Sequence, residues 1–239
     1  MATTSATISR RPSRKFYTWV ALGVILIVFA GFAKTYYLKG FFGTPSLPPL
    51  VHLHGFIMTT WFLLFLVQVR LVDARKVQLH RKLGVFGFTL AALIVVVGLA
   101  VAIAAARRGS GPPGVSALQF LTVPVFDMLV FATLVTLGLV FRHKVEKHRR
   151  LMVLCSVGIL AAAIARIPIA ALATAGPLAY FGLTDLFVLV VLIYDTVKHR
   201  RLHPVYAWGL VFIVASQVIR LAISGTAGWL AVAKWMTGT

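Results

Sequence analysis

The sequence is dominated by apolar runs that are close to the length of about 20 residues needed to cross the hydrocarbon core of a bilayer. The runs are continuous and do not alternate between apolar and polar residues. Because backbone groups in lipid must be satisfied within a helix or a closed barrel, we expect helices. Seven membrane spans are predicted, at about 16–33, 51–71, 82–106, 117–141, 150–173, 178–197 and 204–225.

The composition excludes a freely soluble protein. Of the 239 residues, 60% are hydrophobic and only 12% are charged, and the mean hydropathy is +0.94. The formal net charge of +19 could suit nucleic acid. However, the basic residues lie in short clusters between apolar runs, where loops carry them, so no nucleic-acid partner is expected. The expected partner is the lipid bilayer, with anionic lipid headgroups at the basic turns.

The distribution of basic residues predicts the orientation of the chain. Seventeen of the 24 Lys and Arg residues lie before the first span or in alternate loops, within 10–15, 70–82, 142–150 and 198–201. Cytoplasmic loops carry such an excess. We therefore expect a bacterial inner-membrane protein with a disordered basic cytoplasmic tail (1–15), a single transmembrane domain (16–239) and an external C-terminus.

The rare polar residues suggest that spans two to seven are three pseudo-repeated helical hairpins after one leading helix. Each copy has a polar marker, a His-containing basic turn and a second marker, and the turn-to-marker spacings are 18, 18 and 17 residues. The copies run from His54 through His80 to Gly98, from Asp127 through His148 to Arg166, and from Asp185 through His203 to Arg220.

The hairpins place several ionisable residues in the outer half of the membrane. At about 1.5 Å of rise per residue, all of them lie roughly 20 to 27 Å above their basic turns. Charges buried in lipid face the bundle and pair, so we expect Asp127 to pair with Arg166 and Asp185 with Arg220. The predicted layer comprises His54, Asp127, Arg166, Asp185 and Arg220, together with Gln68 on the stripe of His54 and Gln217 on that of Arg220.

This layer favours an outward-facing polar cavity that binds or passes a small polar or anionic solute or protons. Arginine side chains hold carboxylate or phosphate groups, and histidine exchanges protons near neutral pH. The alternative is that the ion pairs only fix helix register, as in an assembly or scaffold subunit without a ligand. Both interpretations favour a protein that is not an enzyme.

A second alternative is a b-type haem near the cytoplasmic side. His80 and His148 each begin a helix in a copy of the basic turn and could supply axial ligands, with nearby arginines for the haem propionates. The protein would then be a haem-dependent membrane oxidoreductase. The competing interpretation is that His-Arg-Lys and His-Arg-Arg anchor helix ends on anionic lipid.

The segment from about residue 50 to 170 resembles a family of uncharacterised predicted bacterial multi-pass membrane proteins. The resemblance rests on His52-x-His54-Gly55, Met58, Trp61, Gln68, His80-Arg81-Lys82-Leu83-Gly84, His148-Arg149-Arg150-Leu151-Met152 and Arg166. It implies a fold and a location but no activity. The pattern is also loosely similar to ascorbate-type diheme membrane cytochromes, but the partner histidines at the outer depth are missing, so it implies at most one inner haem.

Overall fold

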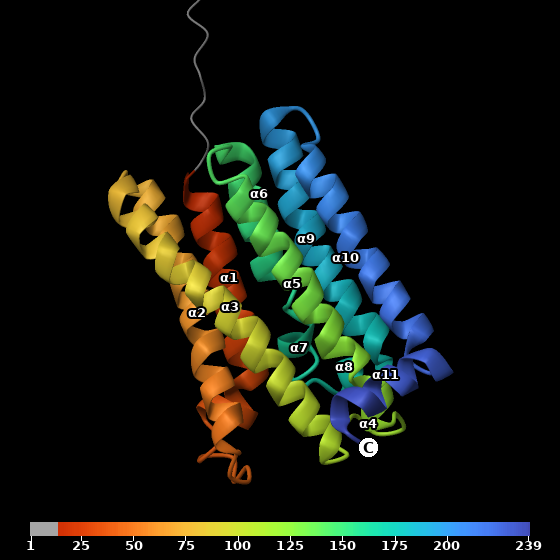
Figure 1. Cartoon of the computed structure of the whole chain (residues 1–239). Helices are drawn as coiled ribbons and strands as arrows, with labels where there is room; N and C mark the ends of the chain where they lie inside the picture. The colour runs from red at the N-terminus through yellow and green to blue at the C-terminus, as the bar shows by residue number, and fades with distance from the viewer. Residues whose placement is uncertain (1–13) are drawn as a thin grey trace, which may run out of the picture.

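The computed structural model describes residues 14–239, all of which lie in helices or in the turns between them (Figure 1). The predicted tail, residues 1–15, falls almost entirely outside the described residues. The elements are α1 (Arg14–Phe32), the π-helix η1 (Ala33–Tyr37), α2 (Pro49–Asp73), α3 (Val77–Arg107), α4 (Ala117–Phe120), α5 (Thr122–Val140), α6 (Val145–Val157), α7 (Ala161–Ile164), α8 (Ala170–Ala175), α9 (Pro177–His199), α10 (Pro204–Ile223) and α11 (Ala227–Thr237).

Within residues 14–239, six helices are long and apolar enough to cross a membrane, which confirms six of the predicted spans. They cover Lys15–Tyr37, Pro49–Asp73, Val77–Arg107, Ala117–Val140, Pro177–His199 and Pro204–Ile223, with mean hydropathies between 1.7 and 2.8. Each can satisfy its own backbone hydrogen bonds in hydrocarbon. The chain is therefore a multi-pass membrane protein of the all-α class, and lipid is its main solvent.

Short turns join α2 to α3, α5 to α6 and α9 to α10 at one end of the bundle, uppermost in Figure 1. Helix α1 also begins there. These turns and the helix ends beside them carry most of the basic residues, and we call this the basic end. The opposite end holds the longer connections and the short helices α4 and α11, the second of which lies beyond the last predicted span. The indole N–H of Trp229 in α11 donates to the carbonyl of Leu118 in α4, at 2.8 Å.

The span predicted at 150–173 is not one helix, because this segment divides into α6, α7 and α8. Between α6 and α7 the backbone tightens, since Leu160 N–H bonds the carbonyl of Val157 three residues earlier, at 3.0 Å. Helix α7 ends at Ile164, and Pro168, which has no N–H to donate, lies in the irregular stretch before α8. Hydropathy alone does not detect such an interruption.

The interrupted segment is nevertheless the centre of the bundle. Helix α6 packs against α5, α9 and α10, and α7 packs against α1 and α9. A glycine permits one of these approaches, because a Cβ atom on Gly31 of α1 would clash with the backbone carbonyl of Ala163 in α7. The surrounding long helices therefore position α6 and α7 and shield most of their side chains from lipid.

Candidate polar sites in the bundle

An ion pair joins α5 to α10 near the opposite end of the bundle. Arg220 donates from Nη1 to Asp127 Oδ1, and the two residues are 3% and 8% exposed. Arg220 also donates to Ser216, from Nη2 to the hydroxyl at 3.0 Å and from Nε to the carbonyl at 3.2 Å. These contacts satisfy both buried charges, as the cost of burial requires.

Asp185 on α9 accepts a hydrogen bond from the neighbouring face of α10. Gln217 Nε2 donates to Asp185 Oδ1 at 2.9 Å, and Arg220 is close enough to act on this carboxylate electrostatically. The predicted pairing of Asp185 with Arg220 is therefore replaced by Gln217 with Asp185. Residues 217 and 220 lie three apart on one helix face, so they can reach carboxylates on two different neighbours. We call Asp127, Asp185, Gln217 and Arg220 the carboxylate cluster.

Arg166 does not pair with Asp127, contrary to the prediction. It lies just after α7, where Nη1 donates to the carbonyl of Ala162 at 2.7 Å and the guanidinium lies 5.0 Å from the ring centroid of Phe32. Among residues 14–239 no carboxylate is within ion-pairing distance of Arg166. Its charge is balanced by aromatic and backbone groups alone.

His54 on α2 is the titratable neighbour of Arg166. The two are close enough to interact electrostatically. His54 Nδ1 is buried and has no hydrogen-bond partner in the part of the chain that the structure describes. No hydrogen bond or ion pair in the described range links these two residues to the carboxylate cluster. The single layer predicted from the sequence thus consists of the carboxylate cluster and a separate Arg166–His54 pair.

Gln68 belongs to neither group, although its stripe on α2 is that of His54. It lies fourteen residues further along the helix, which is about 21 Å toward the basic end. A Cβ on Gly84 of α3 would lie 4.0 Å from its Nε2 atom, and its Oε1 atom has no partner among the described residues. The sequence placed Gln68 on the correct face but at the wrong depth for the predicted layer.

His80 and His148, the candidate haem ligands, lie together at the basic end. Their ring centroids are 6.2 Å apart, with an interplanar angle of 77°. His148 Nδ1 lies 2.8 Å from the carbonyl oxygen of Gly138, which favours the tautomer that donates from Nδ1 and leaves Nε2 free. His80 Nδ1 is buried without a partner in the described chain. The structure therefore brings together the two imidazoles that the sequence suggested as haem ligands.

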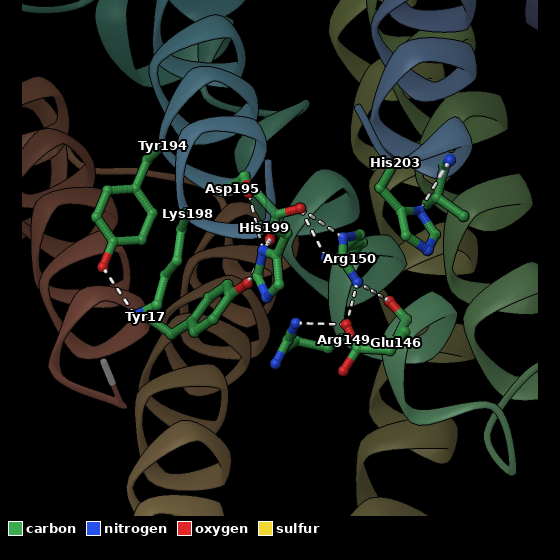
Figure 2. A network of polar contacts seen from close by, with 10 residues as sticks. Tyr17, Glu146, Arg149, Arg150, Tyr194, Asp195, Lys198, His199 and His203 are labelled. Carbon is green, nitrogen blue, oxygen red and sulfur yellow. Dashed lines mark hydrogen bonds and ion pairs between the residues drawn. The ribbon is translucent and has the colours of Figure 1, made fainter. Parts of the chain in front are cut away.

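The most fully satisfied polar site, also at the basic end, was not predicted. Figure 2 shows the guanidinium of Arg150 on α6 between the carboxylates of Asp195 and Glu146. Arg150 and Asp195 are each 1% exposed, and Arg150 donates to Asp195 Oδ2 from Nη2 at 2.7 Å and from Nε at 2.9 Å. Arg150 Nη1 donates to Glu146 Oε2 at 2.6 Å and to its carbonyl at 2.8 Å.

Further contacts extend this Arg150–Asp195 network to neighbouring helices. The hydroxyl of Tyr17 on α1 donates to Asp195 Oδ1 at 3.2 Å, and His199 Nδ1 lies 2.8 Å from the carbonyl of Asp195. The hydroxyl of Thr18 donates to Asp73 Oδ2 on α2 at 3.0 Å. Polar contacts therefore connect α1, α2, α6 and α9 at the basic end.

The sequence did contain a signal for this network. Only five acidic residues are present, and Asp195 lies one turn before the end of a long apolar span. A carboxylate at that depth needs a cation, and Arg150 begins the apolar part of α6. The basic turn suggested lipid headgroups for all its cations, whereas the structure turns Arg150 inward.

No protein-family model, curated protein or solved structure matches this chain. Within residues 14–239, no three His, Cys, Asp or Glu side chains gather into a set that could hold a metal ion.

Replacing Glu146 by Gln is expected to weaken the acid sensitivity of the fold. Burial acts to raise the pKa of Glu146, but the hydrogen bond from Arg150 and the charges of Arg149 and Arg150 outweigh it and hold the pKa below its ordinary value of 4.5. The stabilisation is therefore complete above this ordinary value and is lost as the pH falls through the lower pKa of the folded chain.

The measurement is the Tm of detergent-solubilised protein between about pH 6 and about pH 3. The Tm of Glu146→Gln should fall less over this range than that of the wild type. Arg142→Gln, which removes an exposed charge from the same turn, should retain the wild-type response. Equal acid responses in Glu146→Gln and the wild type would contradict the assignment.

Proposed function

We propose that this chain is a bacterial inner-membrane protein with seven crossings, in which α6, α7 and α8 form a discontinuous fifth crossing. The fifth span predicted from the sequence, 150–173, has 24 residues, which lies within the range of lengths that cross a bilayer. Helix α1 begins at the basic end and α10 finishes at the opposite end, as an odd number of crossings requires (Figure 1). The excess of Lys and Arg places the basic end in the cytoplasm and the C-terminus outside.

The function that the geometry supports best is binding, or passage, of a small anionic solute at the Arg166–His54 pair. The observation that carries this proposal is the unpaired guanidinium of Arg166 beside an interrupted helix. Arg166 lies exposed in the turn after α7, and an ionisable side chain in such a membrane segment marks a candidate functional site. Arg150 and Arg220, which are buried inside the bundle, each pair with a carboxylate. A bound anion would give Arg166 the partner that the described chain does not supply.

The surroundings of Arg166 suit such a ligand. Its planar guanidinium can hold a carboxylate or phosphate through two parallel hydrogen bonds. His54, whose Nδ1 atom has no partner among the described residues, can accept or donate a proton as the anion binds. Discontinuous helices near substrate sites are a recurrent feature of transporters. Asp127, Asp185, Gln217 and Arg220 form a second polar group in the same half, through which protons or a solute could continue.

Arg166→Gln should weaken anion binding without unfolding the bundle, because glutamine keeps polar donors but loses the charge and the planar guanidinium that forms two parallel hydrogen bonds. Small carboxylates and inorganic phosphate serve as probes in thermal-shift titrations of the detergent-solubilised protein. At least one should raise the Tm of the wild type, and Arg166→Gln should weaken its apparent affinity at least about ten-fold, or about 1.4 kcal/mol.

Arg108→Gln provides the matched control, because Arg108 is an exposed arginine at the same end of the bundle. It should titrate like the wild type. If no carboxylate or phosphate stabilises the wild type, or if Arg166→Gln responds as the wild type does, the binding proposal is wrong. The scaffold interpretation would then be preferred.

A second candidate function, electron transfer through a b-type haem, is favoured by the His80–His148 pair. The imidazoles come from two helices, and His148 has the Nδ1 contact to a backbone carbonyl that leaves Nε2 available to a metal. When bound, haem would supply one-electron redox chemistry. His80 and His148 would hold the iron, and the protein would then be a haem-dependent membrane oxidoreductase.

The absorbance spectrum of the purified full chain tests this candidate. A Soret band that shifts on reduction is expected if haem is bound, and His148→Ala should remove it. His143→Ala, which alters an exposed histidine of the same turn, should leave the band intact. Colourless protein from haem-supplemented cells would exclude the redox function.

A further inference from the structure

The turn between α2 and α3 forms a basic cavity at the end of the bundle. Its volume is about 450 Å³, and it is lined by Arg75, Lys76, Val77, Gln78, Leu79 and Lys82. It lies where two long apolar helices end, and therefore at the depth of the lipid headgroups. Three cationic side chains thus surround one concave surface beside the membrane.

The cations of this basic cavity are free to bind a ligand. Over the described range, Arg75, Lys76 and Lys82 make no hydrogen bond or ion pair through their side chains. The one acid nearby, Asp73, accepts a hydrogen bond from Thr18 on α1. The positive charge of the cavity is therefore not neutralised by these side-chain contacts.

The α5–α6 turn differs because its cations already have partners. In the α5–α6 turn, Arg149 and Arg150 bind Glu146, and the ammonium of Lys147 lies 4.8 Å from the ring centroid of Phe141. After α9, Lys198 donates to the hydroxyl of Tyr194 at 3.4 Å. In the α9–α10 turn, by contrast, Arg200 and Arg201 make no side-chain hydrogen bond or ion pair within residues 14–239. The turn before α3 is distinguished by a cavity that three such cations line together.

The turn also presents backbone N–H groups, at the start of α3, close to the cations. Arg75 has a φ of +59°, in the left-handed region, which reverses the chain sharply before α3 begins at Val77. No side chain caps the first N–H groups of this 31-residue helix. Uncapped N–H groups and nearby cations together suit the several oxygens of a phosphate group.

Apolar side chains beside the cations indicate which kind of molecule bears the phosphate group. Val77 and Leu79, which also line the basic cavity, are each 44% exposed. A soluble phosphate would leave these side chains in water, whereas a phospholipid would cover them with its acyl chains. We propose that the basic cavity binds a phosphate group at the membrane surface, that of an anionic phospholipid.

Native mass spectrometry of the full detergent-purified chain tests the proposal. The wild type is titrated separately with short-chain phosphatidylglycerol, phosphatidylcholine and inorganic phosphate. The test variant is Arg75→Gln/Lys76→Gln/Lys82→Gln. The matched control, Arg142→Gln/Lys144→Gln/Lys147→Gln, removes three charges from the next basic turn. We expect phosphatidylglycerol to bind best, to weaken at least about ten-fold in the test variant and to change less than about two-fold in the control.

Each outcome bears on the proposal. Equal losses in the two triple variants, or no loss in either, would overturn it, because general surface charge would then explain retention of the lipid. Inorganic phosphate that binds as tightly as phosphatidylglycerol, and is lost in the same variant, would support the phosphate site but overturn the lipid source. If the triple variant does not keep the wild-type Tm, Lys76→Gln/Lys82→Gln is compared with Lys144→Gln/Lys147→Gln under the same criteria.

Discussion

The buried contact between Arg150 and Asp195 holds the central element of the bundle in place. Helix α6 is short and is interrupted soon after it begins, so its own backbone hydrogen bonds cannot fix its depth. Two donor atoms of Arg150 bind one carboxylate oxygen of Asp195, and both side chains are almost fully buried. Because an unpaired charge at this position is strongly unfavourable, α6 and α9 must keep their register. Because α7 and Arg166 follow α6 in the chain, the register of α6 also determines where they lie.

The two ends of the bundle consequently have different chemistry. At the basic end, contacts between side chains satisfy Arg150 and Asp195 and join α1, α2, α6 and α9. Toward the opposite end, the interruption after α6 leaves Arg166 with only aromatic and backbone contacts in the described chain. The proposed anion site therefore lies toward the opposite end, away from the Arg150–Asp195 network.

The sequence predicted the long helices because hydropathy and length are sufficient to define a membrane span. It did not predict the interruption near Gly158, because this depends on local backbone geometry within an equally apolar segment. The rise per residue of an α-helix predicted that Asp127 and Arg220 lie at nearly the same depth in the membrane. It could not choose their partners, since helix rotation and neighbour order determine whether Arg220 meets Asp127 or Asp185. Arg150 was misassigned because a basic residue near a helix end can face either headgroups or the core.

The reactivity of Cys155 measures most directly whether the Arg150–Asp195 contact holds α6 at the centre. It is the only cysteine of the chain, it lies on α6, and it is 0% exposed. A maleimide should label the detergent-solubilised wild type slowly and Asp195→Asn at least about ten times faster, because Arg150 then loses the carboxylate that ties α6 to α9 and keeps only Glu146 of its own helix as an ion-pair partner. The apolar double variant Arg150→Met/Asp195→Leu should remain protected. Equally slow labelling of Asp195→Asn and the wild type would contradict the account.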